Sequence, residues 1–246
     1  MINIQNMINI VIPMAGLGSR FSNAGYEKPK PFINVNGKPM IVRVIENLNY
    51  PNAKYYLIAR KEHIDQEREL VEQIERDYNV KFISIDRLTE GTASTVLYAR
   101  KFINNNIPLL IANSDQIVDI SIKDFIDDCL SRNLDGSILC FTDKERNPKW
   151  SFAKTNNDGL VSQVKEKEAI SDLATVGIYL FSKGNYFVDG AIDMIIANDR
   201  VNNEFYTCPA YNYIIPEKKI VTYNLLSTQM HGLGTPQDLD NYLESL

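Results

Sequence analysis

The chain has 246 residues, of which 44% are hydrophobic and 23% are charged, and its formal net charge is −5. These values suit one globular α/β domain with a full core and argue against a general nucleic-acid-binding protein. No apolar run approaches the ~20 residues that span a bilayer, and no basic segment precedes an apolar N-terminus, so we expect a cytoplasmic protein without membrane contact. Cys129, Cys140 and Cys208 are widely spaced, which favours reduced thiols over disulfides or a zinc site.

A short apolar run near the N-terminus is followed by a loop of small and basic residues. Residues 10–12 have the length and composition of a buried strand. After it come two glycines and four basic side chains: Gly16, Gly18, Arg20, Lys28, Lys30 and Lys38. Glycines let backbone N–H groups approach a phosphate closely, and the basic side chains can surround an anion with positive charge. The glycine pair by itself fits equally well a tight strand-to-helix turn with solvated lysines.

Strands and helices then alternate regularly as far as residue 141. Predicted strands cover residues 54–59, 80–85, 108–112 and 136–141, and predicted helices cover residues 40–48, 62–78, 91–101 and 121–130. This order predicts a mainly parallel sheet with helices on both faces.

The pattern changes after residue 142. Strands at residues 150–154, 160–164 and 175–181, separated by turn signals, predict a small antiparallel patch on the parallel core. Helices are predicted at residues 183–197 and 208–214, short strands at residues 219–224 and 230–233, and a last helix with Thr235 as its N-cap. At the N-terminus, Met7 is an alternative start, and we expect residues 1–6 to fray.

Three polar segments follow predicted strands, at residues 16–30, 91–95 and 113–119. In a doubly wound sheet, ligands bind beyond the carboxyl ends of the strands. Asp115 comes directly after one such strand, where a lone carboxylate is most often a helix cap or a turn residue. Opposite a phosphate loop it could instead bind Mg²⁺, which prefers one or two carboxylates together with phosphate oxygens and water.

The motifs G-x-G-S-R-F, K-P-x-x-x-V and G-K-P-M-I occur in this order within residues 16–41. Together they resemble the signature of the sugar-phosphate nucleotidylyltransferases. The resemblance implies an α/β, Rossmann-like (GT-A type) fold, with a mainly parallel sheet covered by helices on both faces and a small antiparallel substrate-side sheet. It implies a single domain over residues 1–246, with a nucleotide-binding core at 1–142, the antiparallel substrate-side patch at 143–182, and C-terminal helices and strands at 183–246.

The resemblance also implies roles for individual residues. The nucleotide would be bound by Met14, Ala15, Gly16, Leu17, Gly18, Ser19, Arg20, Gly91, Thr92, Ala93 and Ser114. The acceptor would be bound by Glu166, Lys167, Gly177 and Glu204, catalysis would use Arg20, Lys30 and Lys167, and Mg²⁺ would bind Asp115. Simpler roles stay open: Thr92 as a helix cap, Lys167 on a solvated charged face, and Glu204 as a cap or surface residue.

One motif departs from the family pattern. The family has W-L-D-x-G-T near its C-terminus, and the Asp is commonly a second metal ligand, whereas this chain has Gly232 at that place. Either Asp115, phosphate oxygens and water suffice, or a second carboxylate comes from Glu204, Asp119 or Asp240. His231 is a poor match for Mg²⁺, and we expect it to be packed or hydrogen-bonded.

The implied activity is transfer of a nucleoside monophosphate from a nucleoside triphosphate to a phosphorylated small molecule, with release of pyrophosphate. The segments NSDQ, EFYTCPAYN and HGLGTP most resemble small transferases of capsule and surface-polysaccharide pathways, which include a cytidylyltransferase acting on phosphoglutamine, and this favours CTP. The near alternative is a sugar 1-phosphate acceptor with UTP, dTTP or GTP. A GT-A glycosyltransferase or a non-catalytic nucleotide-binding paralogue fits less well. The class alone suggests a homodimer.

Overall fold

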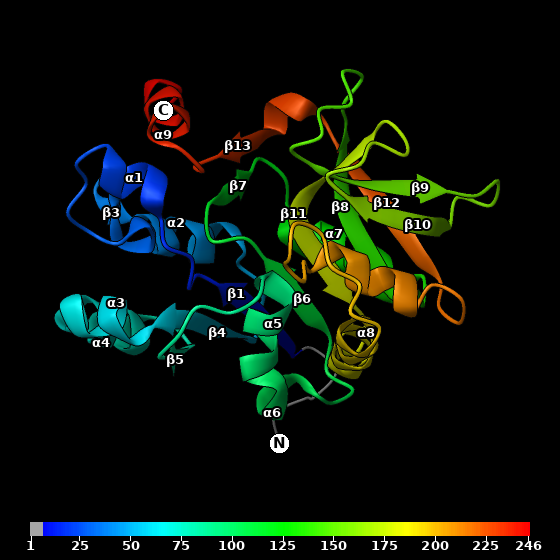
Figure 1. Cartoon of the computed structure of the whole chain (residues 1–246), viewed down its shortest axis with the longest axis horizontal. Coiled ribbons are helices and arrows are strands. Elements are labelled where there is room, and N and C mark those ends of the chain that lie inside the picture. Colours follow the sequence, from blue (N-terminus) through cyan, green and yellow to red (C-terminus); the bar gives the residue numbers. More distant parts are fainter. Residues whose placement is uncertain (1–6) are drawn as a thin grey trace.

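A nine-stranded mixed sheet runs through residues 7–246, the part of the chain that the computed structural model describes (Figure 1). The expectation for residues 1–6 lies outside the described residues. The strands of this sheet are β1 Ile8–Pro13, β4 Ala53–Arg60, β5 Val80–Ile85, β6 Leu109–Ala112, β8 Gly136–Thr142, β9 Ser151–Thr155, β10 Val161–Glu166, β11 Leu173–Phe181 and β12 Ile220–Leu225. Two short ribbons pair β2 Asn34–Val35 with β3 Lys38–Pro39, and β7 Gln116–Val118 with β13 Met230–Gly232.

The sheet confirms the predicted fold class and shows how its two parts join. Strands β6, β1, β4 and β5 are parallel neighbours, as the alternating pattern predicts. Strand β11 is antiparallel to both β6 and β8, and it also pairs with β9, which pairs with β10. The antiparallel strands therefore continue the main sheet, and β11 lies between β6 and β8.

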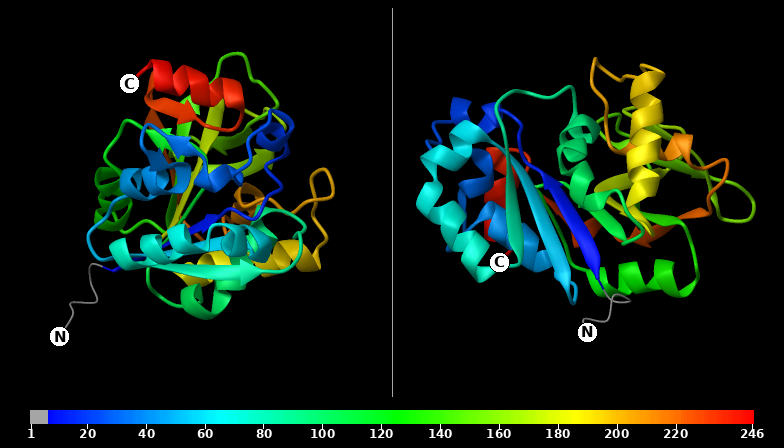
Figure 2. Two further views of the ribbon diagram at one scale, coloured as in Figure 1. Left: turned by 90° about the vertical axis from the view of Figure 1, so that its left-hand side faces the viewer. Right: turned by 90° about the horizontal axis from the view of Figure 1, so that it is seen from below.

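Side chains that alternate along each strand build a core on each face of the sheet. In β1, Ile10 and Ile12 pack into one core and Val11 into the other. The first core is covered by α2 Met40–Asn47, α4 Arg68–Asp77 and α7 Ile122–Ser131, and the second by α5 Thr92–Val96, α6 Arg100–Ile103 and α8 Gly184–Ile196. Figure 2 shows α7 and α8 on opposite sides of the strands.

Three predicted helices differ in detail. The helix expected at residues 62–78 is split at Glu67 into α3 Lys61–Gln66 and α4, because the backbone of Glu67 leaves the helical region (φ −112°, ψ 36°). The helix expected at 91–101 consists of α5, the 3₁₀ turn Leu97–Ala99 and α6. The segment Cys208–Tyr213 is a 3₁₀ helix with Pro209 in its first turn.

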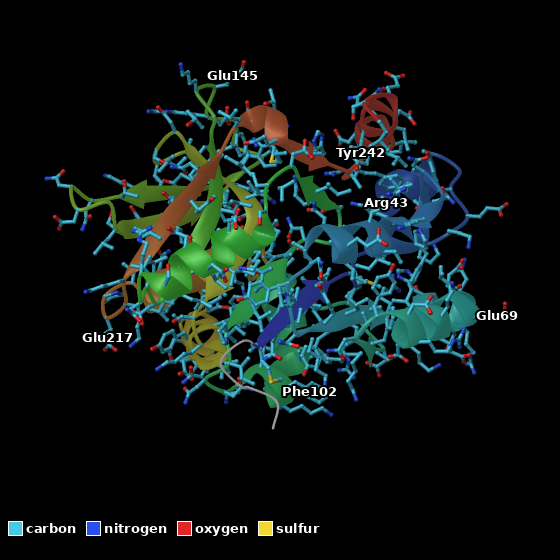
Figure 3. All side chains as sticks on the ribbon, turned by 180° about the vertical axis from the view of Figure 1, so that it is seen from behind. Arg43, Glu69, Phe102, Glu145, Glu217 and Tyr242 are labelled. Atoms are coloured by element: carbon cyan, nitrogen blue, oxygen red, sulfur yellow. The ribbon has the colours of Figure 1, made fainter. Side chains whose placement is uncertain are left out.

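The C-terminal helix α9 Pro236–Glu244 packs beside α1 Ser19–Asn23, far from it in sequence (Figure 1). Leu233 and Leu239 share a buried cluster with Phe21 and Ile117. Seen from behind, Tyr242 of α9 and Arg43 of α2 lie on the same side of the molecule (Figure 3). This packing brings the segment before α9 against the carboxyl end of β6. Within residues 7–246, no helix is long and apolar enough to cross a bilayer.

Candidate active site

A cavity of about 420 Å³ lies beyond the carboxyl ends of β1 and β6. Most of the residues assigned to nucleotide, metal or phosphate binding line it: Met14, Gly16, Gly18, Ser19, Arg20, Lys30, Thr92, Ser114 and Asp115. Because β1 and β6 are parallel neighbours, the loop after one strand faces the polar segment after the other. The sheet thus brings together two segments that are about 85 residues apart, as between Lys30 and Asp115.

Four residues expected at the nucleotide do not line this cavity. Ala15 and Ala93 are buried in the core beneath it, and Leu17 is 58% exposed. Gly91 has φ +108°, and a β-carbon there would lie 2.6 Å from the backbone nitrogen of Phe205. Gly91 therefore allows the chain to turn closely against the segment around Phe205.

Lys30 and Asp115 form an ion pair at the wall of the cavity. Their side chains are 16% and 26% exposed, so the pair is shielded yet reachable from the cleft. Lys30 opens the 3₁₀ turn Lys30–Phe32, directly after Pro29, and its ammonium also lies 5.5 Å from the centre of the Phe21 ring. The pair shows that this carboxylate is positioned to face a cation.

The other two lysines of the first motif point elsewhere. Lys28 donates to Glu67 at 2.8 Å, and Lys38 donates to Glu46 at 2.6 Å. Neither lines the cavity. The expectation that four basic residues surround one anion is therefore wrong for Lys28 and Lys38, since tertiary partners that the local sequence does not reveal engage both side chains.

A second cavity of about 710 Å³ continues the first on the side of the antiparallel strands. Both are lined by Arg20, Thr92, Asn113, Asp115 and Gly234. Farther from the shared wall, the second cavity is lined by Trp150, Glu166, Gly177, Tyr179 and Tyr206. The two cavities therefore form one cleft, with Arg20 and Asp115 at the junction.

Glu166 provides a buried carboxylate in the second cavity. It ends β10 and is 9% exposed. The hydroxyl of Ser151, on the neighbouring strand β9, donates to its Oε2 atom. Burial raises the pKa of the Glu166 carboxyl, against the opposing effects of the Ser151 hydrogen bond and the charge of Lys167. The charged form of Glu166 is therefore costly until hydrogen-bond donors or a cation approach it.

Lys167 and Glu204 line neither cavity, although both lie beside Tyr206 at the edge of the second cavity. The ammonium of Lys167 donates to the phenol oxygen of Tyr206 at 2.7 Å, and Tyr206 lines the second cavity. Burial, and then the hydrogen bond and charge of Glu204, raise the pKa of the Tyr206 phenol. The phenol is therefore neutral at physiological pH and connects Lys167 to the cleft.

Hydrogen bonds connect the Gly91–Ala93 turn to the segment around Phe205 and Thr207, beside the second cavity. The hydroxyl of Thr92 accepts from the backbone N–H and from the hydroxyl of Thr207, each at 3.1 Å. The N–H of Ala93 donates to the carbonyl of Phe205 at 2.9 Å. The helix N-cap is Gly91, without a side-chain cap, so the alternative role of Thr92 as a helix cap is wrong.

Asn113 and Gln116 belong to the polar segment 113–119 and line the cleft, but the sequence analysis gave neither of them a role. A β-carbon at Gly177 (φ +89°) would lie 2.8 Å from Cγ of Asn113, so Gly177 makes room for this side chain. Gln116 is 6% exposed, and its Nε2 atom has no hydrogen-bond partner among residues 7–246. Asn113 adjoins Ser114 in the sequence, but only the pairing of β7 with β13 places Gln116 opposite Gly232.

The carboxylates proposed to replace the missing Asp at position 232 lie apart from Asp115 or have other partners. Asp119 bonds Nε2 of His231 at 2.6 Å, which confirms that His231 is hydrogen-bonded. Asp240 is exposed on α9, and Glu204 lies outside the cleft. The cleft is lined instead by Asp238, which the sequence analysis did not propose as a metal ligand.

The chain is similar to known proteins over most of its length. The chain is 23% identical over 235 residues to the bifunctional protein GlmU of Methanocaldococcus jannaschii, covering 94% of this chain and 52% of that protein. It is 24% identical over 234 residues to a mannose-1-phosphate guanyltransferase of Pichia angusta, covering 93% of this chain and 61% of that protein. The chain thus spans about half the length of the curated relatives it matches.

The fold is shared with the solved structure of a nucleoside-diphosphate-sugar pyrophosphorylase from Vibrio cholerae RC9. The TM-score is 0.81 at 24% identity, and the match covers 96% of this chain and 99% of that chain. The sequence model described as "Nucleotidyl transferase" matches residues 10–204, most of the chain and all of the first cavity except Gly234. The chain therefore belongs to the nucleotidyl transferase family.

Proposed function

We propose that this protein transfers a nucleoside monophosphate from a nucleoside triphosphate to a phosphorylated small molecule and releases pyrophosphate. The observation that carries the proposal is the continuity of the two cavities, with Arg20 and Asp115 at their junction and Lys30 paired with Asp115. A transfer between two phosphate compounds needs two adjoining sites and positive charge between them. The cleft supplies both.

The reaction needs charge neutralisation and positioning more than proton transfer. A phosphate monoester is largely dianionic at pH 7, because its second pKa is about 6. One of its oxygens attacks the α-phosphorus, a new P–O bond forms, and the bond to the leaving pyrophosphate breaks. Arg20 and Lys30 would stabilise the triphosphate and the pyrophosphate, and Lys167 with Tyr206 would hold the acceptor phosphate. Neither of the two histidines, His63 and His231, lines the cleft.

Asp115 is the residue that we propose to bind Mg²⁺. Its carboxylate is partly exposed, lines both cavities and already faces a cation, the ammonium of Lys30. An oxygen donor next to a triphosphate site suits this metal, which prefers carboxylate, phosphate and water oxygens. When bound, Mg²⁺ would neutralise negative charge on the triphosphate. The ion pair would then have to open, which leaves Lys30 free to contact phosphate.

The identity of the two substrates rests on resemblance. The polar segments NSDQ and HGLGTP favour CTP and a non-sugar acceptor such as phosphoglutamine, used in capsule or surface-polysaccharide synthesis. The name of the Pichia angusta relative instead favours a sugar 1-phosphate, with GTP as the donor. Glu166 is compatible with both acceptors, because its buried carboxylate can accept hydrogen bonds from hydroxyl or ammonium groups.

The test is pyrophosphate release with Mg²⁺, crossing CTP, UTP, dTTP, GTP and ATP with sugar 1-phosphates, phosphocholine and phosphoglutamine. Release that requires one nucleotide and one acceptor would identify both substrates. Nucleotide binding by thermal shift with no release for any pair would favour a non-catalytic protein. If no triphosphate binds at all, the assignment of the first cavity is wrong.

A further inference from the structure

We propose that Asp238 supplies the second carboxylate of the Mg²⁺ site, together with Asp115, and so replaces the aspartate that the family resemblance would place at position 232. This inference rests on the proposed function, because it deepens the assignment of the metal to Asp115. Asp238 would be a direct ligand or would hold a water of the ion, on the acceptor side of the cleft.

The geometry around Gly234 carries the proposal. A β-carbon at Gly234 would lie 3.6 Å from Oδ2 of Asp238 and 3.7 Å from Oδ2 of Asp115. Both carboxylate oxygens therefore border the space beside residue 234, which has no side chain, and Oδ2 of Asp115 also contacts the Lys30 ammonium, which would have to move when a metal binds. Gly234 lines both cavities, so this space belongs to the cleft.

Both carboxylates are held in place by the backbone around them. The N–H of Leu233 donates to the carbonyl of Asp115 at 2.7 Å, which fixes the segment before α9 against the end of β6. The hydroxyl of Thr235 accepts from the N–H of Asp238 at 3.1 Å and starts the helix. Leu239 is 2% exposed in a buried cluster and anchors the same turn. Asp238 therefore projects from a fixed helix end rather than from a loose loop.

The donor set suits Mg²⁺. Among residues 7–246, no three His, Cys, Asp or Glu side chains gather in a way that could hold a metal by themselves. Two carboxylates leave the remaining positions of an octahedral ion to phosphate oxygens and water, which is the usual arrangement for Mg²⁺ at phosphate sites. At position 232 itself, the one atom of residues 7–246 within 4 Å of a β-carbon would be Nε2 of Gln116, at 3.9 Å. This atom is a donor that cannot bind a cation.

The experiment is titration of the full chain with Mn²⁺, a spin-active substitute for Mg²⁺, followed by electron paramagnetic resonance. We expect D238N to weaken Mn²⁺ binding at least tenfold, since even indirect partners of a metal ligand cost about 10–100-fold in affinity. D240N is the matched control, because Asp240 is an exposed aspartate on the same helix. It should leave Mn²⁺ affinity unchanged.

Two further variants separate metal binding from a structural role of Asp238 at the helix end. G234A places a methyl group at ordinary contact distance from both carboxylates, so it should weaken Mn²⁺ binding while the metal-free thermal midpoint stays the same. D115N tests the proposed function itself. If D115N weakens Mn²⁺ binding and D238N binds like D240N, the role of Asp238 is refuted and the assignment of Asp115 stands. If D115N and D238N both bind Mn²⁺ as the wild type does, both assignments fail.

Discussion

The two halves of the cleft are built in different ways. The first cavity, which we propose as the nucleotide side, takes most of its lining from two continuous segments, residues 13–31 and 113–115. The second cavity, the proposed acceptor side, takes its lining from short, distant pieces around Trp150, Glu166, Gly177, Tyr206 and Gly232. Residues that line a site from one loop can be recognised as a sequence motif. Residues that come from many strands are brought together only by the packing of the sheet and helices.

The halves also differ in charge. On the nucleotide side, the cations Arg20 and Lys30 face the cavity. On the acceptor side, the buried group is the carboxylate of Glu166, Lys149 lines the cavity, and Lys167 is bonded to Tyr206. This arrangement suits a donor that carries several phosphates and an acceptor that presents hydrogen-bond donors beside a single phosphate. Changes on the nucleotide side should therefore affect turnover, and changes on the acceptor side should affect selectivity.

The largest expected effect is that of K30A. Removing this ammonium should lower kcat for pyrophosphate release by about 10²–10³-fold, the usual cost of losing one group that stabilises developing negative charge. The matched control is K28A, from the same motif, because Lys28 is bonded to Glu67 outside the cavity. K28A should keep a near-wild-type kcat. If both variants lost kcat equally, the position of Lys30 in the cavity would not explain its effect, and the role assigned to it would be wrong.

Lys28 and Lys30 show which features of the site the sequence could predict and which it could not. The glycine loop and Asp115 were predictable, because each closely follows a strand end and parallel strands bring their ends together. Arg20 and Lys30 were assigned through the motif that contains them. Lys28 and Lys30 are two residues apart, and only tertiary contacts give them different partners.

The remaining differences have the same origin. Asp238 and Gln116 enter the cleft because β13 pairs with β7 and α9 packs on the first loop. The break at Glu67 depends on a backbone departure that helical spacing does not reveal. Local patterns therefore predicted the elements and the nucleotide loop, and long-range packing decided the acceptor side.

G91A tests the connection between the two halves. A side chain at Gly91 would strain the backbone at φ +108° and collide with the backbone of Phe205, so we expect a loss of about 2–4 kcal/mol in the free energy of unfolding. G25A is the matched control, because Gly25 has φ +86° but open space around it, and it should lose about 1 kcal/mol. Denaturant unfolding measures both values. If the two variants lose equal stability, backbone strain alone explains Gly91, and the close approach to Phe205 carries no cost.

The smallest effect, and the sharpest test of the acceptor side, is that of E166Q. Because burial raises the pKa of Glu166, its contribution to stability is fully present below its ordinary pKa of 4.5 and is lost as the pH rises through the raised value. E166Q removes this dependence, so its thermal midpoint should exceed that of the wild type at pH 7, with the difference disappearing towards pH 4.

The same change should raise KM for the acceptor and leave KM for the nucleotide unchanged. A variant that gains stability and keeps its acceptor KM would mean that Glu166 is buried for structural reasons alone. A variant that is less stable at pH 7 would mean that the charge is compensated within the fold. Only a gain in stability together with a loss of acceptor affinity fits a carboxylate that is held, at a cost, for the acceptor.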